Sequence, residues 1–267
     1  MSRSMSRREM MGMVAMMGTA GLGLALGNGK LPLASASEHL DLEPRGDHKL
    51  HALLSALAKV KKRRDYRNLT MISLHRDEWD HEAIALLLHY HGKPKQVWDN
   101  TVFGSPWLNL MRNSLNAQVY SFGKKDALVL SATHGTAHLA LFDDKMWEKY
   151  RLYEKAEVKS KTNPLVRLSP ASSKPLSSLN DPHGVLSPED NNIPVLQARG
   201  VVFLACHNMI WELSGALKKG GINPDHKTHG EIAAELTNHL IPGVVLTPGI
   251  VGTLPLLAEA GYQYAHS

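Results

Sequence analysis

The sequence predicts an α/β protein built on a parallel sheet of about five strands flanked by helices. From residue 93 onward, short apolar runs alternate with longer segments whose apolar residues follow helical spacing. Strands that alternate with helices form parallel sheets with right-handed crossovers. The clearest run covers residues 201–206 and is uninterrupted by polar residues, which is typical of a strand buried on both faces.

Residues 1–36 have the pattern of a twin-arginine signal peptide. Arg7 and Arg8 precede an apolar stretch that continues to Leu26, and small residues at 34–36 supply a cleavage site. The alternative is a short membrane anchor, but the stretch is shorter than the ~20 apolar residues that a spanning helix needs. We therefore expect export to the periplasm, cleavage after Ala36 and no stable membrane insertion of the mature chain.

The charge balance argues against a nucleic-acid partner. The whole chain has a formal net charge of +5, from 30 Lys and Arg residues and 25 acidic ones. The signal peptide holds four of these basic residues and one acidic residue, so the remainder has 26 against 24, or +2. Such a small excess removes the main support for nucleic-acid binding. The basic cluster at 59–64 instead suits the end of a helix, where cations are stabilised.

Residues 37–92 are expected to form a helical N-terminal extension. The spacing of Leu50, Leu53 and Leu57 predicts one apolar helix face, and that of Ile84 and Leu87 predicts another. The α/β domain then covers residues 93–267.

Two strand–helix units are predicted over residues 93–150. The strands cover 95–99 and 127–132, and the second strand ends at His134-Gly135. Ser105 and Pro106 have the residue types of an N-cap and a first helical position, so a helix is expected to begin there. A second helix is expected to turn Leu139, Phe142, Met146 and Tyr150 inward.

Residues 151–193 are an insertion in this domain. Prolines recur among Ser, Asn and Asp residues, so the segment cannot be one helix or one strand. Loops of this length are either functional or inserted. We expect the part from Pro164 to Pro194 to be a mobile cover that reaches the edge of the sheet where the strands end.

The strand at 201–206 ends in the only cysteine of the chain, Cys206, and a helix is expected at 209–219. Thr228 and Glu231 form a capping box for the next helix. A strand at 244–247, a short helix at 255–260 and a last strand at 262–265 complete the sheet.

The carboxyl ends of these strands are the predicted site, because open α/β sheets bind ligands there. Cys206 and His207 are the candidate catalytic residues, since a thiol at a helix N-terminus beside an imidazole is activated as a nucleophile. The alternative is a buried, inert cysteine. The candidate ligand-binding residues at the neighbouring strand ends are Asn208, His134, Thr247 and Gly249.

No cofactor or metal is predicted. The chain has no Gly-x-Gly-x-x-Gly, no Walker loop and no Cys-x-x-Cys-His motif. His134, His138 and Cys206 would suit zinc or copper in type, but no compact ligand motif is complete. The pairs Asp99-Asn100 and Asp143-Asp144 have no partner spacing that selects them for acid–base chemistry.

The segment 201–265 resembles the DsrE-like family. The resemblance is carried by the strand that ends in Cys206, by Leu-Ile-Pro-Gly-Val-Val at 240–245, by Pro-Gly-Ile-Val-Gly at 248–252 and by Ala-Gly-Tyr-Gln-Tyr at 260–264. It extends to 95–99 and 142–147. The resemblance implies a flavodoxin-like fold, homo-oligomers and, in sulfur-relay members, a persulfide-carrying cysteine at the position of Cys206.

Two functions follow as hypotheses. The first is an exported DsrE-like protein that uses Cys206 as a sulfur carrier or thiol redox group, with a sulfur-donor protein or a small thiol as its partner. The second is a non-catalytic periplasmic module for ligand binding, metal binding or assembly, in which Cys206 is structural.

Overall fold

The computed structural model describes residues 40, 42–172, 176 and 178–267, so the predicted signal peptide lies outside the described residues. Its centre is a five-stranded sheet in the order β4-β3-β2-β1-β5, and every strand pair is parallel. The predicted flavodoxin-like α/β class is therefore confirmed. The strands are β1 (Lys95–Asn100), β2 (Leu128–Thr133), β3 (Val202–Cys206), β4 (Val245–Thr247) and β5 (Gln263–His266).

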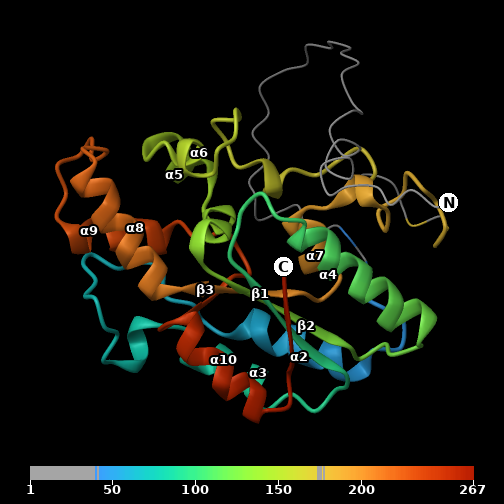
Figure 1. The fold of residues 1–267 in the computed structure, drawn as a ribbon. Helices are drawn as coiled ribbons and strands as arrows, with labels where there is room; N and C mark the ends of the chain where they lie inside the picture. The colour runs from blue at the N-terminus through green and yellow to red at the C-terminus, as the bar shows by residue number, and fades with distance from the viewer. Residues whose placement is uncertain (1–39, 41, 173–175, 177) are drawn as a thin grey trace, which may run out of the picture. The chain divides into compact units, whose positions relative to one another are not determined.

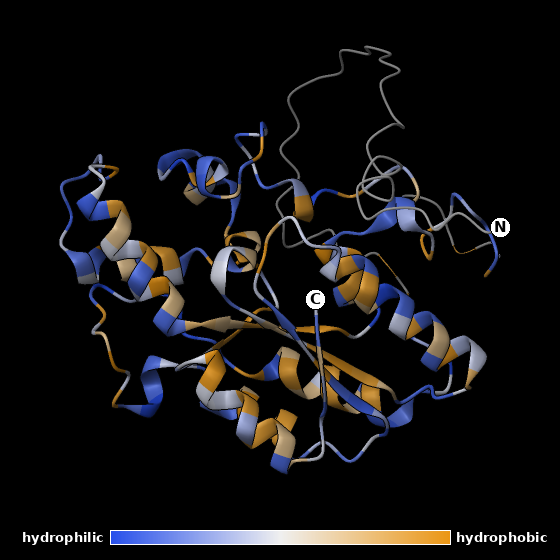
Figure 2. Cartoon of the chain, viewed as in Figure 1, coloured by the Kyte–Doolittle hydropathy of each residue, from blue (hydrophilic) through white to orange (hydrophobic). Residues whose placement is uncertain are grey.

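The central strands are apolar because both of their faces are covered. Every residue of β2, β3 and β4 is buried, whereas the edge strand β5 is largely exposed. Figure 2 shows hydrophobic colouring along the sheet and on the helix surfaces that face it. Side chains of successive strand residues point to opposite faces, so each buried strand supplies two separate cores.

The first face of the sheet is covered by helices that follow β1, β2 and β3. Trp107 and Phe203 meet edge to face in this core, with ring centroids 6.2 Å apart. Fully buried Ile210 and Leu236 of the later helices belong to the same core. The helices are α4 (Trp107–Leu115), α7 (Ile193–Ala198), α8 (His207–Lys219) and α9 (His229–Asn238).

The second face is covered by α2 (His48–Lys59), α3 (His81–Leu88) and α10 (Ile250–Glu259), which lie together below the sheet in Figure 1. Leu50 and Leu87 are fully buried here against Leu128 and Leu130 of β2. A parallel sheet needs both faces buried, so the N-terminal helices are part of the core of the fold.

The connections after β3 and β4 leave the sheet on opposite faces. Helix α8 packs on the first face through Ile210, and α10 packs on the second through Ile250. In an open α/β sheet, such divergence of neighbouring connections opens a crevice beyond the strand ends. Cys206 and Thr247 are register partners at that point.

Several helix boundaries differ from the predicted ones. The continuous helix expected before Tyr150 is instead a 3-10 helix, η4 (Gly135–Leu141), followed by α5 (Asp144–Lys149), because Asp143 caps α5 through Met146 N at 3.0 Å. Ser105 donates to Val102 O at 3.0 Å and does not cap α4. After α4, the chain forms a π-helical turn, η3 (Asn116–Ser121).

Three helix starts were also placed too late or missed. Helix α8 begins at His207, and α10 begins at Ile250 and contains Pro255, which was expected to start it. Helix α7 was not predicted, although Asn192 caps it by accepting from Val195 N at 2.9 Å. The capping box of Thr228 and Glu231 is confirmed.

The described part of the 151–193 insertion contains α6 (Leu152–Lys155), η5 (Pro164–Val166) and η6 (Pro188–Asp190). Asn163 Nδ2 donates to Ala140 O and Phe142 O, each at 2.8 Å, and Arg112 Nη1 donates to Leu186 O at 2.6 Å. These contacts lie on the first face, whereas Cys206 belongs to the core of the second. The expected cover over the thiol is therefore not seen among the described residues. The remaining short helix, η2 (Arg76–Glu78), precedes α3.

The described part of the chain contains no helix that is both long and apolar enough to cross a membrane.

Candidate functional site

Cys206 lies where two helix N-termini meet at the carboxyl edge of the sheet. Its Sγ accepts hydrogen bonds from Met209 N of α8 and from Ile250 N of α10, each at 3.4 Å. The residue is 5% exposed and is a free cysteine. Helix N-termini carry partial positive charge and unsatisfied N–H groups, so the protein directs two hydrogen-bond donors at the sulfur.

The backbone of Cys206 is fixed by a buried histidine. Cys206 N donates to His138 Nε2 at 3.0 Å, and the His138 ring lies 5.1 Å from that of Phe142. Complete burial lowers the pKa of His138 to about 3, with a smaller contribution from the nearby His134. The ring is therefore neutral at physiological pH and acts as a hydrogen-bond acceptor for the backbone of Cys206.

His207 is turned away from solvent. Its Nε2 lies 2.7 Å from Thr70 O, its Nδ1 has no hydrogen-bond partner among the described residues, and the residue is 1% exposed. Burial lowers the pKa of His207. The observed contact ties the start of α8 to the segment before η2, so a catalytic role for His207 remains a prediction.

The other predicted residues of this edge are brought together around α8 and α10. Thr247 is fully buried, and its Oγ1 donates to Ala205 O at 2.8 Å. Gly249 is the N-cap of α10, and a Cβ at this position would lie 2.8 Å from Asn208 Nδ2. Asn208 is exposed, so its amide is an accessible polar group beside Gly249.

His134 belongs to a hydrogen-bonded group at the ends of β1, β2 and β5, which we call the rim cluster: Asp99, His134 and Tyr264. His134 Nε2 lies 2.6 Å from Asp99 Oδ1, and Tyr264 OH donates to Asp99 Oδ2 at 2.7 Å. The side chains of His134 and Asp99 are 22% and 17% exposed. The bond to Asp99 raises the pKa of Tyr264. The cluster is thus hydrogen-bonded and partly accessible to solvent.

The loop that carries His134 is held against the loop after β1. His134 N donates to Asn100 O at 3.0 Å, and Ala137 N donates to Thr101 O at 3.2 Å. Gly135 has φ +55°, and any Cβ there would collide with Thr101 O. Glycine is therefore required for the close approach that orients His134.

The sequence predicts His134 as a site residue but does not predict its partners Asp99 and Tyr264. The available signal was that Asp99 and His134 end two neighbouring strands of a parallel sheet, whose carboxyl ends share one edge.

Within the described residues, no three His, Cys, Asp or Glu side chains are arranged to hold a metal ion. His138 and Cys206 meet through a backbone N–H and not through the thiol.

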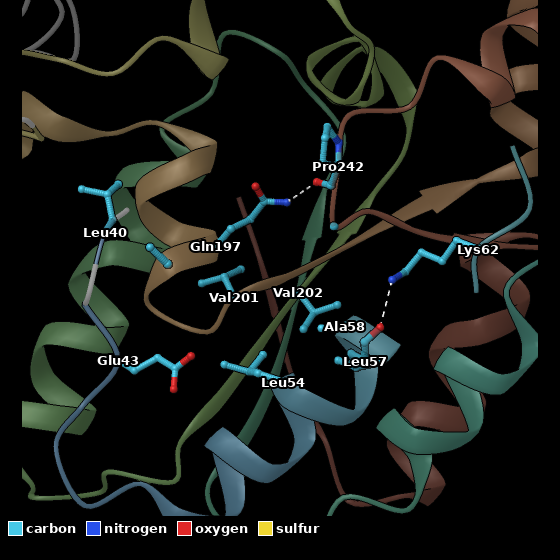
Figure 3. Close-up of a pocket in the computed structure, with 12 residues that line it drawn as sticks. Leu40, Glu43, Leu54, Leu57, Ala58, Lys62, Gln197, Val201, Val202 and Pro242 are labelled. Atoms are coloured by element: carbon cyan, nitrogen blue, oxygen red, sulfur yellow. Dashed lines mark hydrogen bonds between the residues drawn. The ribbon is translucent and has the colours of Figure 1, made fainter. Parts of the chain in front are cut away.

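A cavity of about 370 Å³ lies at the opposite, amino edge of the sheet. Figure 3 shows Gln197 bound to Pro242 on one side and Lys62 bound to Leu57 on the other, with hydrogen bonds of 2.8 and 3.2 Å. It is also lined by Val202, which begins β3, and by Val201 before it. Since Cys206 ends the same strand, this cavity is separate from the thiol site.

Fold and site together define an α/β protein with a single thiol at the carboxyl edge of a parallel sheet, where the connections after β3 and β4 leave on opposite faces. Comparison with known proteins adds no family: no family model, curated protein or solved structure matches the chain.

Proposed function

We propose that the protein is an exported, DsrE-like sulfur carrier or thiol redox protein that uses Cys206. The observation that carries this proposal is the convergence of two helix N-termini, from α8 and α10, on the Cys206 sulfur. A thiol reacts as its thiolate, whose sulfur is negatively charged, and helix N-termini stabilise negative charge. The same donors would face the sulfur of a persulfide.

The position of the thiol also supports chemistry. Cys206 ends β3 beside Thr247 of β4, at the carboxyl edge where α/β sheets hold their ligands. Exposed Asn208 supplies a polar group for a small thiol or for the backbone of a sulfur-donor protein. Periplasmic export remains part of the proposal and rests on residues 1–36.

The second candidate is a non-catalytic periplasmic module in which Cys206 is structural. It is favoured by the 5% exposure of Cys206 and by its place in the core of the second face. A free cysteine ordinarily packs in the core as a small apolar residue.

Thiol reactivity separates the two candidates. We expect iodoacetamide to modify Cys206 in the folded protein at least about ten-fold faster than a thiol without the helix donors. The matched control is the double variant C206A/A205C, because Ala205 is fully buried one residue earlier on β3. Equal labelling rates in the two folded proteins would reject the carrier hypothesis. Intact mass of protein purified from its native compartment would then show whether Cys206 carries extra sulfur.

We also propose that the protein is a homo-oligomer. Light scattering at micromolar concentration is expected to give a mass above that of one chain, and a monomer would contradict this.

A further inference from the structure

Four residues near the carboxyl edge belong to four adjacent strands: Cys206 ends β3, His134 directly follows β2, Asp99 is the penultimate residue of β1, and Tyr264 lies on β5 in register with Val97. The order β3-β2-β1-β5 places Cys206, His134, Asp99 and Tyr264 in that sequence. Two of the three steps between them are hydrogen bonds, of 2.7 Å from Tyr264 to Asp99 and 2.6 Å from Asp99 to His134. The third step runs from His134 to Cys206.

His134 and Cys206 occupy matching positions on neighbouring strands. Thr133 of β2 pairs with Ala205 of β3, and His134 and Cys206 are the next residue on each. Cys206 packs in the core of the second face, as does Val97, which lies two residues before Asp99. Because alternate strand residues share a face, Asp99 and Cys206 point to the same side of the sheet.

We propose that His134 is the proton acceptor and donor for chemistry at Cys206, with Asp99 as the residue that positions it. This inference rests on the proposed sulfur-carrier function. An ionised carboxylate only accepts hydrogen bonds, so His134 Nε2 carries the proton toward Asp99 Oδ1 and leaves the Nδ1 lone pair available. A histidine oriented in this way by a carboxylate is the arrangement that activates nucleophiles in hydrolases.

The two other histidines near the thiol are engaged elsewhere. His138 Nε2 accepts from the backbone N–H of Cys206, and His207 Nε2 lies on Thr70 O. Both rings are buried, at 0% and 1% exposure, whereas the His134 side chain is 22% exposed. Of these three histidines, His134 is the one that combines accessibility with a carboxylate partner among the described residues.

The proposed step transfers one sulfur atom from a persulfide donor. The Cys206 thiol gives its proton to His134 Nδ1, and the thiolate attacks the outer sulfur of R–S–SH. The new bond joins the two sulfurs of Cys206–S–SH, while the S–S bond of the donor breaks. The leaving R–S⁻ takes the proton from His134 and departs as R–SH. No external oxidant or reductant is consumed.

The experiment follows sulfur gain on the full chain with glutathione persulfide as the donor, measured by intact mass over time. Wild type is expected to gain one sulfur atom and C206S none. H134Q is expected to react about 100-fold more slowly, within the usual range for removing a general base. The matched control is H239Q, because His239 Nδ1 lies 2.7 Å from Asp143 Oδ2 and both side chains are 26% exposed. Its rate should equal that of wild type.

Rescue distinguishes proton transfer from folding. H134A should recover at least about ten-fold in rate with free imidazole, because the added base can enter the vacated space. For the positioning residue, D99N should be slow and D99E should recover part of the rate.

The results test the carrier function and the role of His134 separately. Wild type that gains no sulfur would reject the carrier function itself. Wild type that reacts while H134Q matches its rate would reject the role of His134 and leave the carrier function standing. A slow H134A variant that imidazole does not rescue would also reject proton transfer by His134, since a lost structural contact would explain it.

Discussion

Two polar clusters in this molecule are built from the same parts. The first is the rim cluster. The second, the α5–α9 cluster, consists of Asp143, Lys149, Tyr150, Glu235 and His239. Each contains an Asp–His pair, with N–O distances of 2.6 and 2.7 Å, and a tyrosine OH that donates to a carboxylate, at 2.7 and 2.6 Å.

The clusters differ in what their carboxylates hold. Asp143 also caps α5 through Met146 N, and Glu235 accepts from Lys149 and Lys227 at 2.6 and 2.7 Å. Asp99 bonds through its side chain only to His134 and Tyr264 within the described residues. The α5–α9 cluster therefore joins helices, while the rim cluster orients an accessible imidazole at the strand ends. Residue types and distances alone do not separate these roles, but the elements they connect do.

The largest effect is expected from G135A, which breaks the rim cluster through its backbone. Gly135 has φ +55°, and a Cβ would collide with Thr101 O. Strain and collision together should cost about 3 kcal/mol of unfolding free energy, and sulfur gain should fall as His134 moves. Urea unfolding measures the loss of unfolding free energy, and intact mass measures the loss of sulfur gain.

The control for this substitution is G123A. Gly123 has φ +64° but no atom within 4 Å of its Cβ position, so strain alone should cost about 1 kcal/mol. Equal losses for the two variants would show that contact with the loop after β1 does not hold His134.

The next effect is expected from E235Q in the α5–α9 cluster. Burial raises the pKa of Glu235, but hydrogen bonds from Lys149, Lys227 and Tyr150 outweigh it and lower this pKa to about 2, below the ordinary value of 4.5. The carboxylate therefore stabilises the fold fully above pH 4.5, and this contribution is lost as the pH falls through 2. At pH 7 the variant should lose about 2 kcal/mol.

Urea unfolding of E235Q and wild type at pH 7 and pH 3 tests this. The difference in unfolding free energy should shrink at pH 3. E148Q, which alters an exposed glutamate of α5, should differ from wild type by less than about 0.5 kcal/mol at both pH values. A pH-independent difference for E235Q would mean that its charge is not the stabilising feature.

A smaller effect is expected when the two aspartates are compared directly. D143A removes an N-cap and should lower the unfolding free energy by about 1 kcal/mol without changing sulfur gain. D99A should have the smaller effect on stability and the larger effect on sulfur gain. Calorimetry measures the stability of both variants, and intact mass measures their sulfur gain. If the two variants differed in stability but gained sulfur at the same rate, the two clusters would not differ in function.

The sequence predicted the central strands because their apolar runs are specified locally. The predicted strand at 201–206 starts one residue before β3, and the one at 127–132 is shifted by one residue from β2. The capping box at Thr228 was also visible, since both of its partners lie within one helical turn. Cys206 could be placed at the carboxyl edge on the same basis.

The bond between Tyr264 and Asp99 and the second donor to Cys206 could not be predicted, because they join residues distant in the chain. Asp99 and Tyr264 are 165 residues apart, and their bond requires β5 to return beside β1. Likewise, Ile250 N donates to the sulfur of Cys206, 44 residues earlier, and this contact requires α10 to pack on the second face. Pro255 suggested a helix start, but its place inside α10 shows that packing outweighed that local preference.

The smallest effect is expected for Y264F, which removes only the outermost hydrogen bond of the rim cluster. Tyr264 is 57% exposed and lies on the edge strand, so water replaces its OH easily. The unfolding free energy should change by less than about 0.5 kcal/mol, and sulfur gain should slow by about five-fold or less, since one neutral hydrogen bond contributes about 1 kcal/mol.

The matched variant is Y150F, whose OH donates to Glu235 Oε2 at 2.6 Å from a fully buried ring. Its loss should cost about 1–2 kcal/mol in urea unfolding, because a buried acceptor is left with fewer donors, and sulfur gain should not change. The two tyrosines then give opposite readouts from the same chemical change. If Y264F lowered stability as much as Y150F and left the rate untouched, the rim cluster would be a structural contact like the α5–α9 cluster, and the order of residues along the strand ends would carry no chemistry.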